Sequence, residues 1–409
     1  MHPLRLGAAV LTVPVLAACG DAHLPGPGFV VRDSAGITIV ENVAPLWTAD
    51  EAPRLGSAPT VTIGEVDGEA PYLFSQVQAA TRLSDGSIIV VDDRQVEIRL
   101  FDGAGQYVRT IASRGDGPGE LGRALFIQRV GGDTLLIQDL GRGRLESFSV
   151  RVGHLGSVPF LRSSTASFRP EYRFDDGTYL AWQALLGFTQ PPAPGEPQFV
   201  RTRAERDLHR LSADGTADLG LILRVATTDA YNHYLNESIH FDRIPFGRIP
   251  VRKGAGDRFY YGEAEGYEVR SYAPDGTPLR IIRLAQPPRP VTPAEIQAYT
   301  EGIRTGFLAD APAEIAAMWE RTFDAIPYPE IHPPYTALVI DDQDRPWLRD
   351  STPEGESQLW RVFDREGVYL GEVSMPEELE VLEIGSDYVL GRITDDLDVP
   401  RVQLWDLIQ

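Results

Sequence analysis

Two kinds of β-hairpin alternate along this chain, and this internal repeat limits its possible folds more than any other feature. The first kind joins a short strand to a strongly apolar strand through a polar turn. Its six copies lie at residues 79–92 and around Gly131, Gly177, Gly254, Asp342 and Ser386. The second kind follows the first and has five copies, around Gly103, Gly153, Gly215, Gly276 and Arg365. Asp-Gly between apolar runs is a strong hairpin signal, because glycine accepts the positive φ that such turns require.

One hairpin of each kind forms a four-stranded antiparallel sheet, and the shortest repeats recur at roughly 45 residues, the size of one propeller blade. We therefore predict an all-β fold, a six-bladed β-propeller over residues 29–409. The sixth repeat ends one strand short at residues 401–409, whereas residues 36–43 form an unpaired strand near the N-terminus. We expect this N-terminal strand to complete the sixth blade, because ring closure removes open sheet edges.

Composition and charge narrow the range of partners. The apolar fraction of 43% is sufficient for a large core. The formal net charge of −21 disfavours binding to nucleic acid or to anionic lipid headgroups. Of the 38 lysine and arginine residues, Lys253 is the only lysine. We ascribe this bias to a GC-rich genome rather than to a binding role.

The N-terminal residues have the features of a bacterial lipoprotein signal. In residues 1–18, Arg5 provides a positive charge and residues 6–16 provide an apolar stretch too short to span a bilayer. The only cysteine of the chain, Cys19, follows Leu-Ala-Ala, as in a lipobox. We expect cleavage before Cys19, acylation of its thiol, and a flexible Pro/Gly-rich tether over residues 19–28. These features predict a lipid-anchored, extracytoplasmic protein of the cell envelope.

The first predicted blade resembles an NHL repeat, whose usual form runs from an aspartate through a short turn to Arg-Ile-x-Val-Phe-Asp. In residues 90–121 the pattern matches without a gap at Asp92, Ile98, Phe101 and Asp102, and Glu97 replaces the usual arginine. The matching positions in the second and sixth blades are Asp139, Gly141, Arg144, Leu145, Phe148, Arg401, Val402 and Trp405. Blades three to five match loosely. The chain is similar to bacterial six-bladed propeller lipoproteins, a resemblance that implies the fold and not one particular activity.

Three long insertions are predicted to lie on one face of the propeller. They span residues 186–203, 225–247 and 286–335, which join either the middle strands of a blade or successive blades. Such connections share one face, and insertions tend to line the binding face of repeat proteins. The last insertion contains a helical segment at residues 292–326, which begins with the capping-box sequence Thr-Pro-Ala-Glu. Its apolar stripes are expected to pack onto the propeller rather than to contact a ligand.

These considerations predict a monomeric binding or scaffold protein whose inserted face takes a small molecule, a peptide or an envelope protein. The candidate ligand-binding residues are Asp92, Arg94, Arg142, Arg169, Tyr172, Trp182, Tyr231, His233, Arg248, His332 and Tyr335. No catalytic residue can be named from the sequence.

The alternative is a metal-dependent lyase or hydrolase with its site at the mouth of the channel. Some NHL-type propellers are metal-dependent lyases with histidines at this mouth, and His233, His240 and His332 all lie in the insertions. The spacing of these histidines matches no metal-binding motif. Aspartates that could bind calcium cluster within residues 92–93, 341–344 and 395–398, but turn chemistry explains most of these clusters. We therefore predict no metal or cofactor, and keep calcium or zinc as the alternative.

The lipid anchor leads to the first prediction. Cys19→Ser removes the thiol that receives the diacylglycerol, so the variant should accumulate as precursor or as released protein. Membrane fractionation and mass spectrometry of the N-terminus measure this. Membrane association equal to that of the wild type would contradict the lipobox interpretation.

Overall fold

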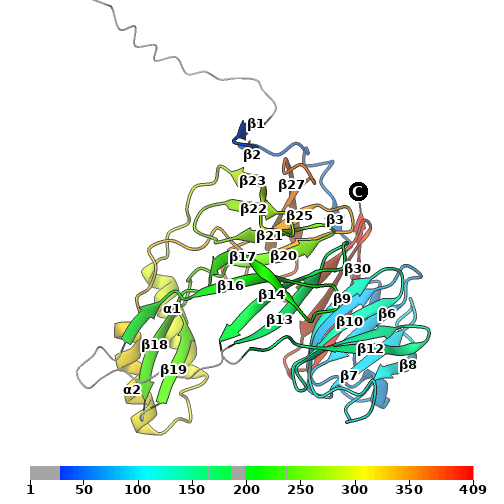
Figure 1. Cartoon of the computed structure of the whole chain (residues 1–409). Coiled ribbons are helices and arrows are strands. Elements are labelled where there is room, and N and C mark those ends of the chain that lie inside the picture. The colour runs from blue at the N-terminus through cyan, green and yellow to red at the C-terminus, as the bar shows by residue number, and fades with distance from the viewer. Residues whose placement is uncertain (1–27, 164–165, 186–198, 236–237, 409) are drawn as a thin grey trace, which may run out of the picture.

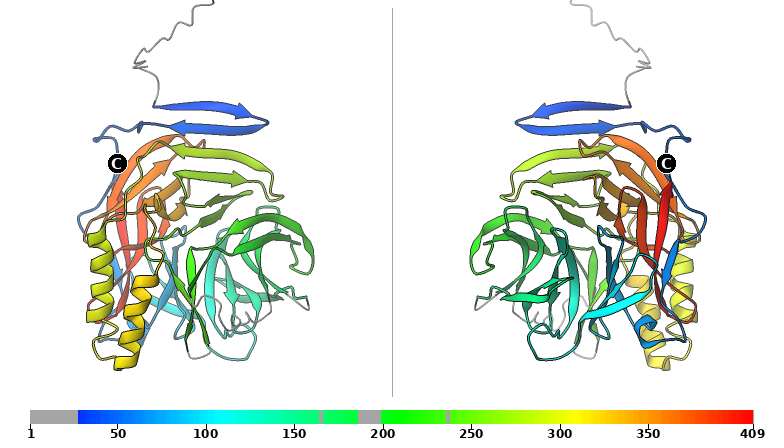
Figure 2. Two further views of the ribbon diagram at one scale, coloured as in Figure 1. Left: turned by 90° about the vertical axis from the view of Figure 1, so that its left-hand side faces the viewer. Right: turned by 90° about the vertical axis from the view of Figure 1, so that its right-hand side faces the viewer.

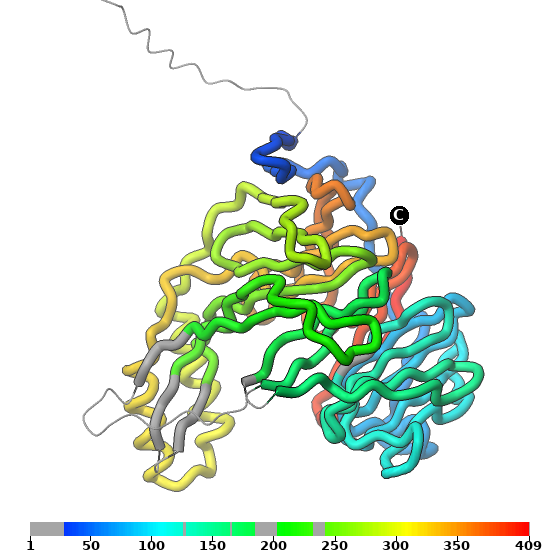
Figure 3. Tube along the Cα trace, viewed as in Figure 1, coloured from blue at the N-terminus to red at the C-terminus, as the bar shows by residue number. Residues whose placement is uncertain are grey.

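The computed structural model describes residues 28–163, 166–185, 199–235 and 238–408 (Figure 3). Signal sequence, Cys19 and nearly all of the predicted tether lie outside these residues. The described residues form seven sheets, and six of these are the antiparallel blades of a ring (Figure 1). The prediction of an all-β, six-bladed propeller is thereby confirmed.

Each blade runs from an inner strand beside the channel to an outer strand at the rim. Blade one comprises β5 (Val77–Arg82), β6 (Ile88–Asp92), β7 (Glu97–Phe101) and β8 (Tyr107–Ala112). Blade two comprises β9 (Ala124–Val130), β10 (Thr134–Asp139), β11 (Arg144–Ser149) and β12 (Gly153–Pro159). Blade three comprises β13 (Ala166–Arg173), β14 (Tyr179–Leu185), β16 (Glu205–Leu211) and β17 (Asp218–Ala226). Blades four and five comprise β20 (Val251–Ala255), β21 (Arg258–Gly262), β22 (Glu268–Tyr272) and β23 (Pro278–Leu284); and β24 (Tyr335–Ile340), β25 (Pro346–Asp350), β26 (Gln358–Phe363) and β27 (Tyr369–Met375). The three inner strands of blade six are β28 (Glu380–Ile384), β29 (Tyr388–Thr394) and β30 (Pro400–Ile408).

The hydrophobic core lies between neighbouring blades, and strand β6 shows why the second strands are so apolar. Successive side chains of a strand point to opposite faces of its sheet. In β6, Ile88 and Val90 pack toward blade six, whereas Ile89 and Val91 pack toward blade two. All four are fully buried. A strand covered on both faces therefore needs a continuous apolar run rather than alternation.

The turn glycines also allow close packing between blades. Gly276, in the turn between β22 and β23, has a φ of 86°. A Cβ atom built there would lie 2.5 Å from the carbonyl oxygen of Ile222 in the outer strand of blade three. Gly105 has a φ of 81°, and its Cβ would lie 2.8 Å from Val61. Glycine at these two turns thus satisfies both the backbone conformation and the contact with the preceding blade.

An N-terminal strand does close the ring, but it is not the strand that the sequence pattern indicated. Blade six is completed by β4 (Val61–Ile63), which pairs antiparallel with β30 in the register Val61↔Leu404 and Ile63↔Val402. The shorter β3 (Arg54–Leu55) pairs with the end of β30. The expected closing strand, β2 (Ile37–Asn42), instead pairs in parallel with β23 at the rim of blade four. The prediction for residues 36–43 was therefore wrong.

Residues 37–63, which we call the N-terminal belt, follow the rims of three successive blades. After β2 on blade four, the backbone N–H of Trp47 donates to Leu370 at the rim of blade five, at 2.7 Å. The buried side chain of Asn42 bonds to the backbone of both blades, to Arg283 at 2.9 Å and to Tyr369 at 2.8 Å. Strand β1 (Phe29–Ser34) lies outside β2 and forms the edge of that sheet (Figure 2). Strand β2 is longer than β4 and easier to recognise in the sequence, but it belongs to the belt that precedes the closing strand β4.

The insertions leave the same end of the blades and gather into one lobe (Figure 1). The lobe contains a small sheet of β15 (Phe199–Thr202), β18 (Ala230–Leu235) and β19 (Ser238–Arg243), together with α1 (Pro293–Thr305) and α2 (Ala313–Ala325). Its core consists of Tyr231, Ile244, Leu308, Phe323 and Ile326, with the apolar stripes of both helices packed around them. The predicted capping box is present, since Thr292 and Glu295 bond reciprocally. No helix in the described parts of the chain combines the length and apolarity needed to cross a bilayer.

The closing strand yields the second prediction. Ile63→Ala should lower the free energy of unfolding by about 2–5 kcal/mol, the usual cost of truncating a fully buried isoleucine. Val31→Ala, on the exposed strand β1, should change it by less than about 0.5 kcal/mol. Denaturant unfolding of both variants measures the difference. Equal effects would mean that β4 does not secure the ring.

Candidate functional site

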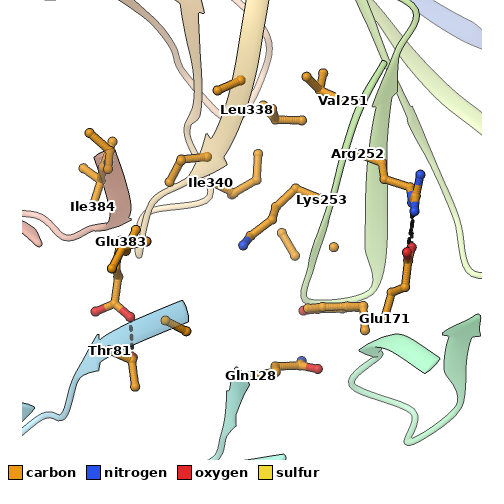
Figure 4. A pocket seen from close by; sticks show the side chains of 18 of the residues that line it. Thr81, Gln128, Glu171, Val251, Arg252, Lys253, Leu338, Ile340, Glu383 and Ile384 are labelled. Atoms are coloured by element: carbon orange, nitrogen blue, oxygen red, sulfur yellow. Dashed lines mark hydrogen bonds and ion pairs between the residues drawn. The ribbon is translucent and has the colours of Figure 1, made fainter. Parts of the chain in front are cut away.

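The inner strands of the blades surround a cavity of about 960 Å³ on the propeller axis (Figure 4). All six blades contribute to its lining, and most of the contributing residues lie on β5, β9, β13, β20, β24 and β28. Thr81, Gln128 and Glu383 lie in the second half of their strands, on the side of the short hairpin turns. The cavity combines this polar wall with the apolar side chains of Leu338 and Ile340.

Lys253 extends into this cavity from the middle of β20, with its nitrogen directed toward the wall that contains Glu383 (Figure 4). Its side chain is exposed to solvent, because it projects from an inner strand into the cavity. Among the described residues, no carboxylate lies within 4.0 Å of its nitrogen. Burial lowers the pKa of Lys253, and the opposing effect of Glu383 is smaller. The only lysine of the chain is therefore an amine that has no ion-pair partner among the described residues and projects into the central cavity.

Glu383 stabilises the wall toward which the nitrogen of Lys253 points, where blades six and one meet. Its carboxylate accepts hydrogen bonds from the Thr81 hydroxyl, the Tyr388 hydroxyl and the backbone N–H of Arg82, the last at 3.1 Å. The Arg82 guanidinium lies 4.6 Å from the centroid of the Tyr388 ring. Burial raises the pKa of Tyr388 above its ordinary value, and the charge of Glu383 raises it further. These bonds join blade six to blade one and fix the carboxylate at the cavity wall.

The wall between blades three and four contains a second group of charges. Arg252 of β20 forms an ion pair with Glu171 of β13. On the neighbouring strands, the guanidinium groups of Arg169 and Arg206 lie 4.9 and 4.0 Å from the ring centroid of Trp182. Trp182 also lines the cavity. Cation–π contacts thus hold two arginines against Trp182, beside the cavity but outside its lining.

Three of the residues predicted from the sequence, Arg169, Tyr172 and Trp182, come together at this wall. Tyr172 of β13 lines the cavity and covers Gly254, where a Cβ atom would lie 2.1 Å from the ring. Burial raises the pKa of Tyr172 to about 12. Its hydroxyl therefore stays protonated at neutral pH and can act as a hydrogen-bond donor.

Two other predicted residues, Asp92 and Arg142, hold the loops of the scaffold together. The carboxylate of Asp92 accepts four backbone N–H bonds, from Ser75, Gln76, Arg94 and Gln95, at 2.7 to 3.2 Å. Asp139 has the same position in blade two, where it accepts from Gly122, Arg123 and Arg142. The side chain of Arg142 donates to the carbonyl of Glu120 and pairs with Asp116. The aspartate of the NHL-like pattern is thus a loop anchor in both blades.

The remaining predicted residues do not join the cavity. Tyr231 and Tyr335 are buried in separate cores, and Tyr335 donates to the carbonyl of Glu268 at 2.7 Å. His332 is buried in the lobe, where its Nε2 lies 3.0 Å from Glu295 and burial lowers its pKa. Arg248 pairs with Asp229 at 3.0 Å, and Arg94 is exposed on a loop.

The histidines do not assemble a metal site in the described part of the chain. No three His, Cys, Asp or Glu side chains there lie where they could ligate one ion. His233 of β18 pairs in register with His240 of β19, but both side chains lie outside the described residues. The metal-dependent alternative therefore stays a prediction.

Sequence reasoning missed four charged residues of the cavity region, Lys253, Glu383, Glu171 and Arg206. Lys253 could have been noticed in the sequence, because a single lysine among 38 basic residues is unusual. The other three are common residue types in strands. Only the convergence of blades three, four and six brings these charges together.

Comparisons with known proteins add likenesses of fold alone. No model of a known protein family matches the chain, and no curated protein matches it. A member of the DUF4221 family from Bacteroides vulgatus is 10% identical, with a TM-score of 0.47 over 87% of this chain and 98% of that one. A Bacteroides fragilis protein provisionally named as exported is 11% identical, with a TM-score of 0.45 over 91% and 99%. A virginiamycin B lyase from Staphylococcus aureus is 9% identical, with a TM-score of 0.38 over 87% and 97%. We infer no activity from identities near these values.

The loop-anchoring role of Asp92 gives the third prediction. Asp92→Ala leaves buried N–H groups without an acceptor and should lower the free energy of unfolding by about 3 kcal/mol. Asp67→Ala, which removes an exposed aspartate, should leave it nearly unchanged. Denaturant unfolding distinguishes the two. A stable Asp92 variant would return this residue to the list of ligand-binding candidates.

Proposed function

We propose that this protein is an extracytoplasmic binding protein, tethered to the membrane through Cys19, that holds a small anionic ligand in the central channel. The observation that carries this proposal is Lys253, an amine that has no ion-pair partner among the described residues and is directed into the central cavity. The proposed binding needs no metal or cofactor and no second copy of the chain. It places the ligand between the inner strands rather than on the inserted lobe.

The local surroundings of Lys253 support an anion, whereas the carboxylates of Asp341, Asp342 and Asp344 line another part of the cavity. A cation that is partly removed from water is costly unless an opposite charge or a set of hydrogen bonds compensates it. The pKa of Lys253 is lowered because desolvation disfavours its charged form. A bound carboxylate or phosphate would provide the missing partner, and charge-assisted hydrogen bonds are stronger in such surroundings than in bulk water.

The cavity wall also offers acceptors for a hydroxyl or amine of the ligand. The side-chain oxygen of Gln78 is buried at the wall and has no hydrogen-bond partner. The Tyr172 hydroxyl lies on the other side of the cavity lining, in blade three. An anion that also carries a hydroxyl or amino group would satisfy these positions. Several other buried polar atoms in the described part of the chain also lack a partner, so Gln78 adds an acceptor to the wall without by itself indicating a ligand.

The fourth prediction tests this proposal with a panel of small carboxylates, phosphates and sugar acids. Members of the panel should raise the thermal unfolding midpoint of the wild type by mass action, and the shift should disappear in Lys253→Met. Lys253→Arg, which keeps the charge, should retain part of it. Equal shifts in the wild type and Lys253→Met, or shifts caused only by neutral compounds or cations, would contradict the proposal.

The fourth prediction has a second readout, the pH dependence of binding. Because burial lowers the pKa of Lys253, the free amine loses its proton at a lower pH than an ordinary lysine does. Affinity for the anion should therefore fall as pH rises through this lowered pKa. Lys253→Arg should remove most of the fall, because a guanidinium stays protonated throughout. Calorimetric titration at several pH values provides the measurement.

A further inference from the structure

The interface between blades three and four, beside the channel, contains more arginine than carboxylate side chains among the described residues. Arg252 and Glu171 neutralise each other across the two blades. Arg169 and Arg206 lie beside them, and neither has a carboxylate within 4.0 Å among the described residues. Both contact the ring of Trp182, a residue of the cavity lining.

The register of blade three explains why these side chains meet. Arg169 of β13 is directly opposite Trp182 of β14, so the two side chains lie on one face of the sheet. Trp182 is opposite Leu208 of β16, and Arg206, two residues earlier, lies on that same face. This face packs toward blade four, because Trp182 belongs to the core cluster that includes Phe259. The arginines are thus built into the interface beside the channel.

The surroundings of Arg206 disfavour the positive charge of its guanidinium group. Burial lowers the pKa of Arg206, and the charges of Arg252 and Arg169 lower it further. Glu171 opposes this effect only in part. Both arginines are partly accessible, so an anion can reach them. Arginine binds carboxylate and phosphate in a planar, bidentate manner, which makes such a pair a strong anion site.

We propose that Arg169 and Arg206, positioned by Trp182, form a second anion subsite at the edge of the cavity, behind the lining residue Trp182, so that the ligand carries two separated anionic groups. This inference rests on the proposed function for the first anionic group, which binds at Lys253. Arg206 is the second residue of β16, which begins at the inserted end of the blade. Glu383, on the wall toward which Lys253 points, lies near the opposite end of its strand. The ligand would therefore extend along the channel, and an α,ω-dicarboxylate is its simplest form.

The fifth prediction uses a series of α,ω-dicarboxylates and the corresponding monocarboxylates, titrated calorimetrically into the full-length protein. At least one dicarboxylate should bind about tenfold or more tightly than its monocarboxylate, as expected for one added charged hydrogen bond. Arg206→Gln should abolish that advantage and leave monocarboxylate binding unchanged. Arg169→Gln provides a second variant in case the first does not fold. Arg151→Gln, which changes an arginine that is 86% exposed, is the matched control and should change neither affinity.

The outcomes separate this inference from the proposed function. If Lys253→Met abolishes monocarboxylate binding but the arginine variants keep the dicarboxylate advantage, the second subsite is wrong and the proposed function stands. If Lys253→Met binds like the wild type while the arginine variants lose the advantage, the subsite stands and the role of Lys253 is wrong. If no dicarboxylate of any length binds more tightly than its monocarboxylate, the inference is overturned.

Discussion

The pairing of β4 with β30 is the interaction on which the rest of the structure depends. Each blade buries its apolar faces only against its two neighbours, so an open ring would expose two faces and two sheet edges. Three residues of β4 join the N-terminal segment to the last strand of the chain, and Ile63 of this strand reaches the core between blades six and one. The cavity exists only because this closure fixes the six inner strands around one axis.

The chemistry of the cavity follows from the same geometry. Apolar side chains fill the spaces between blades, whereas the inner strands face an axis too wide for their side chains to fill. Charged and polar residues can therefore occupy these strands without being packed in a core. Lys253, the Arg252–Glu171 pair and Glu383 all belong to inner strands. The proposed ligand would place one negative charge beside Lys253 and a second beside Arg169 and Arg206.

The aspartates and glycines that made the repeat recognisable serve the scaffold. Asp92 and Asp139 bind backbone N–H groups, and Gly105 and Gly276 allow turns to approach the preceding blade. Such residues define an NHL-like pattern because every blade has the same loops to stabilise. The residues of the cavity follow no repeat, because each blade presents a different side chain to the axis. A repeat pattern therefore predicts the fold and leaves the site unassigned.

The sequence by itself determined the all-β class, the six blades, the N-terminal closure and the helical insertion. These features follow from local signals: turn glycines, apolar runs and the capping box at Thr292. Of the site, the sequence indicated Arg169, Tyr172 and Trp182 but not Lys253, Glu171, Arg206 or Glu383. Only the tertiary structure decided that β4 and not β2 closes the ring, since both can pair with any open edge. Only ring closure, likewise, brings residues from blades one, three, four and six to one axis, because their proximity depends on contacts between blades and not on local sequence.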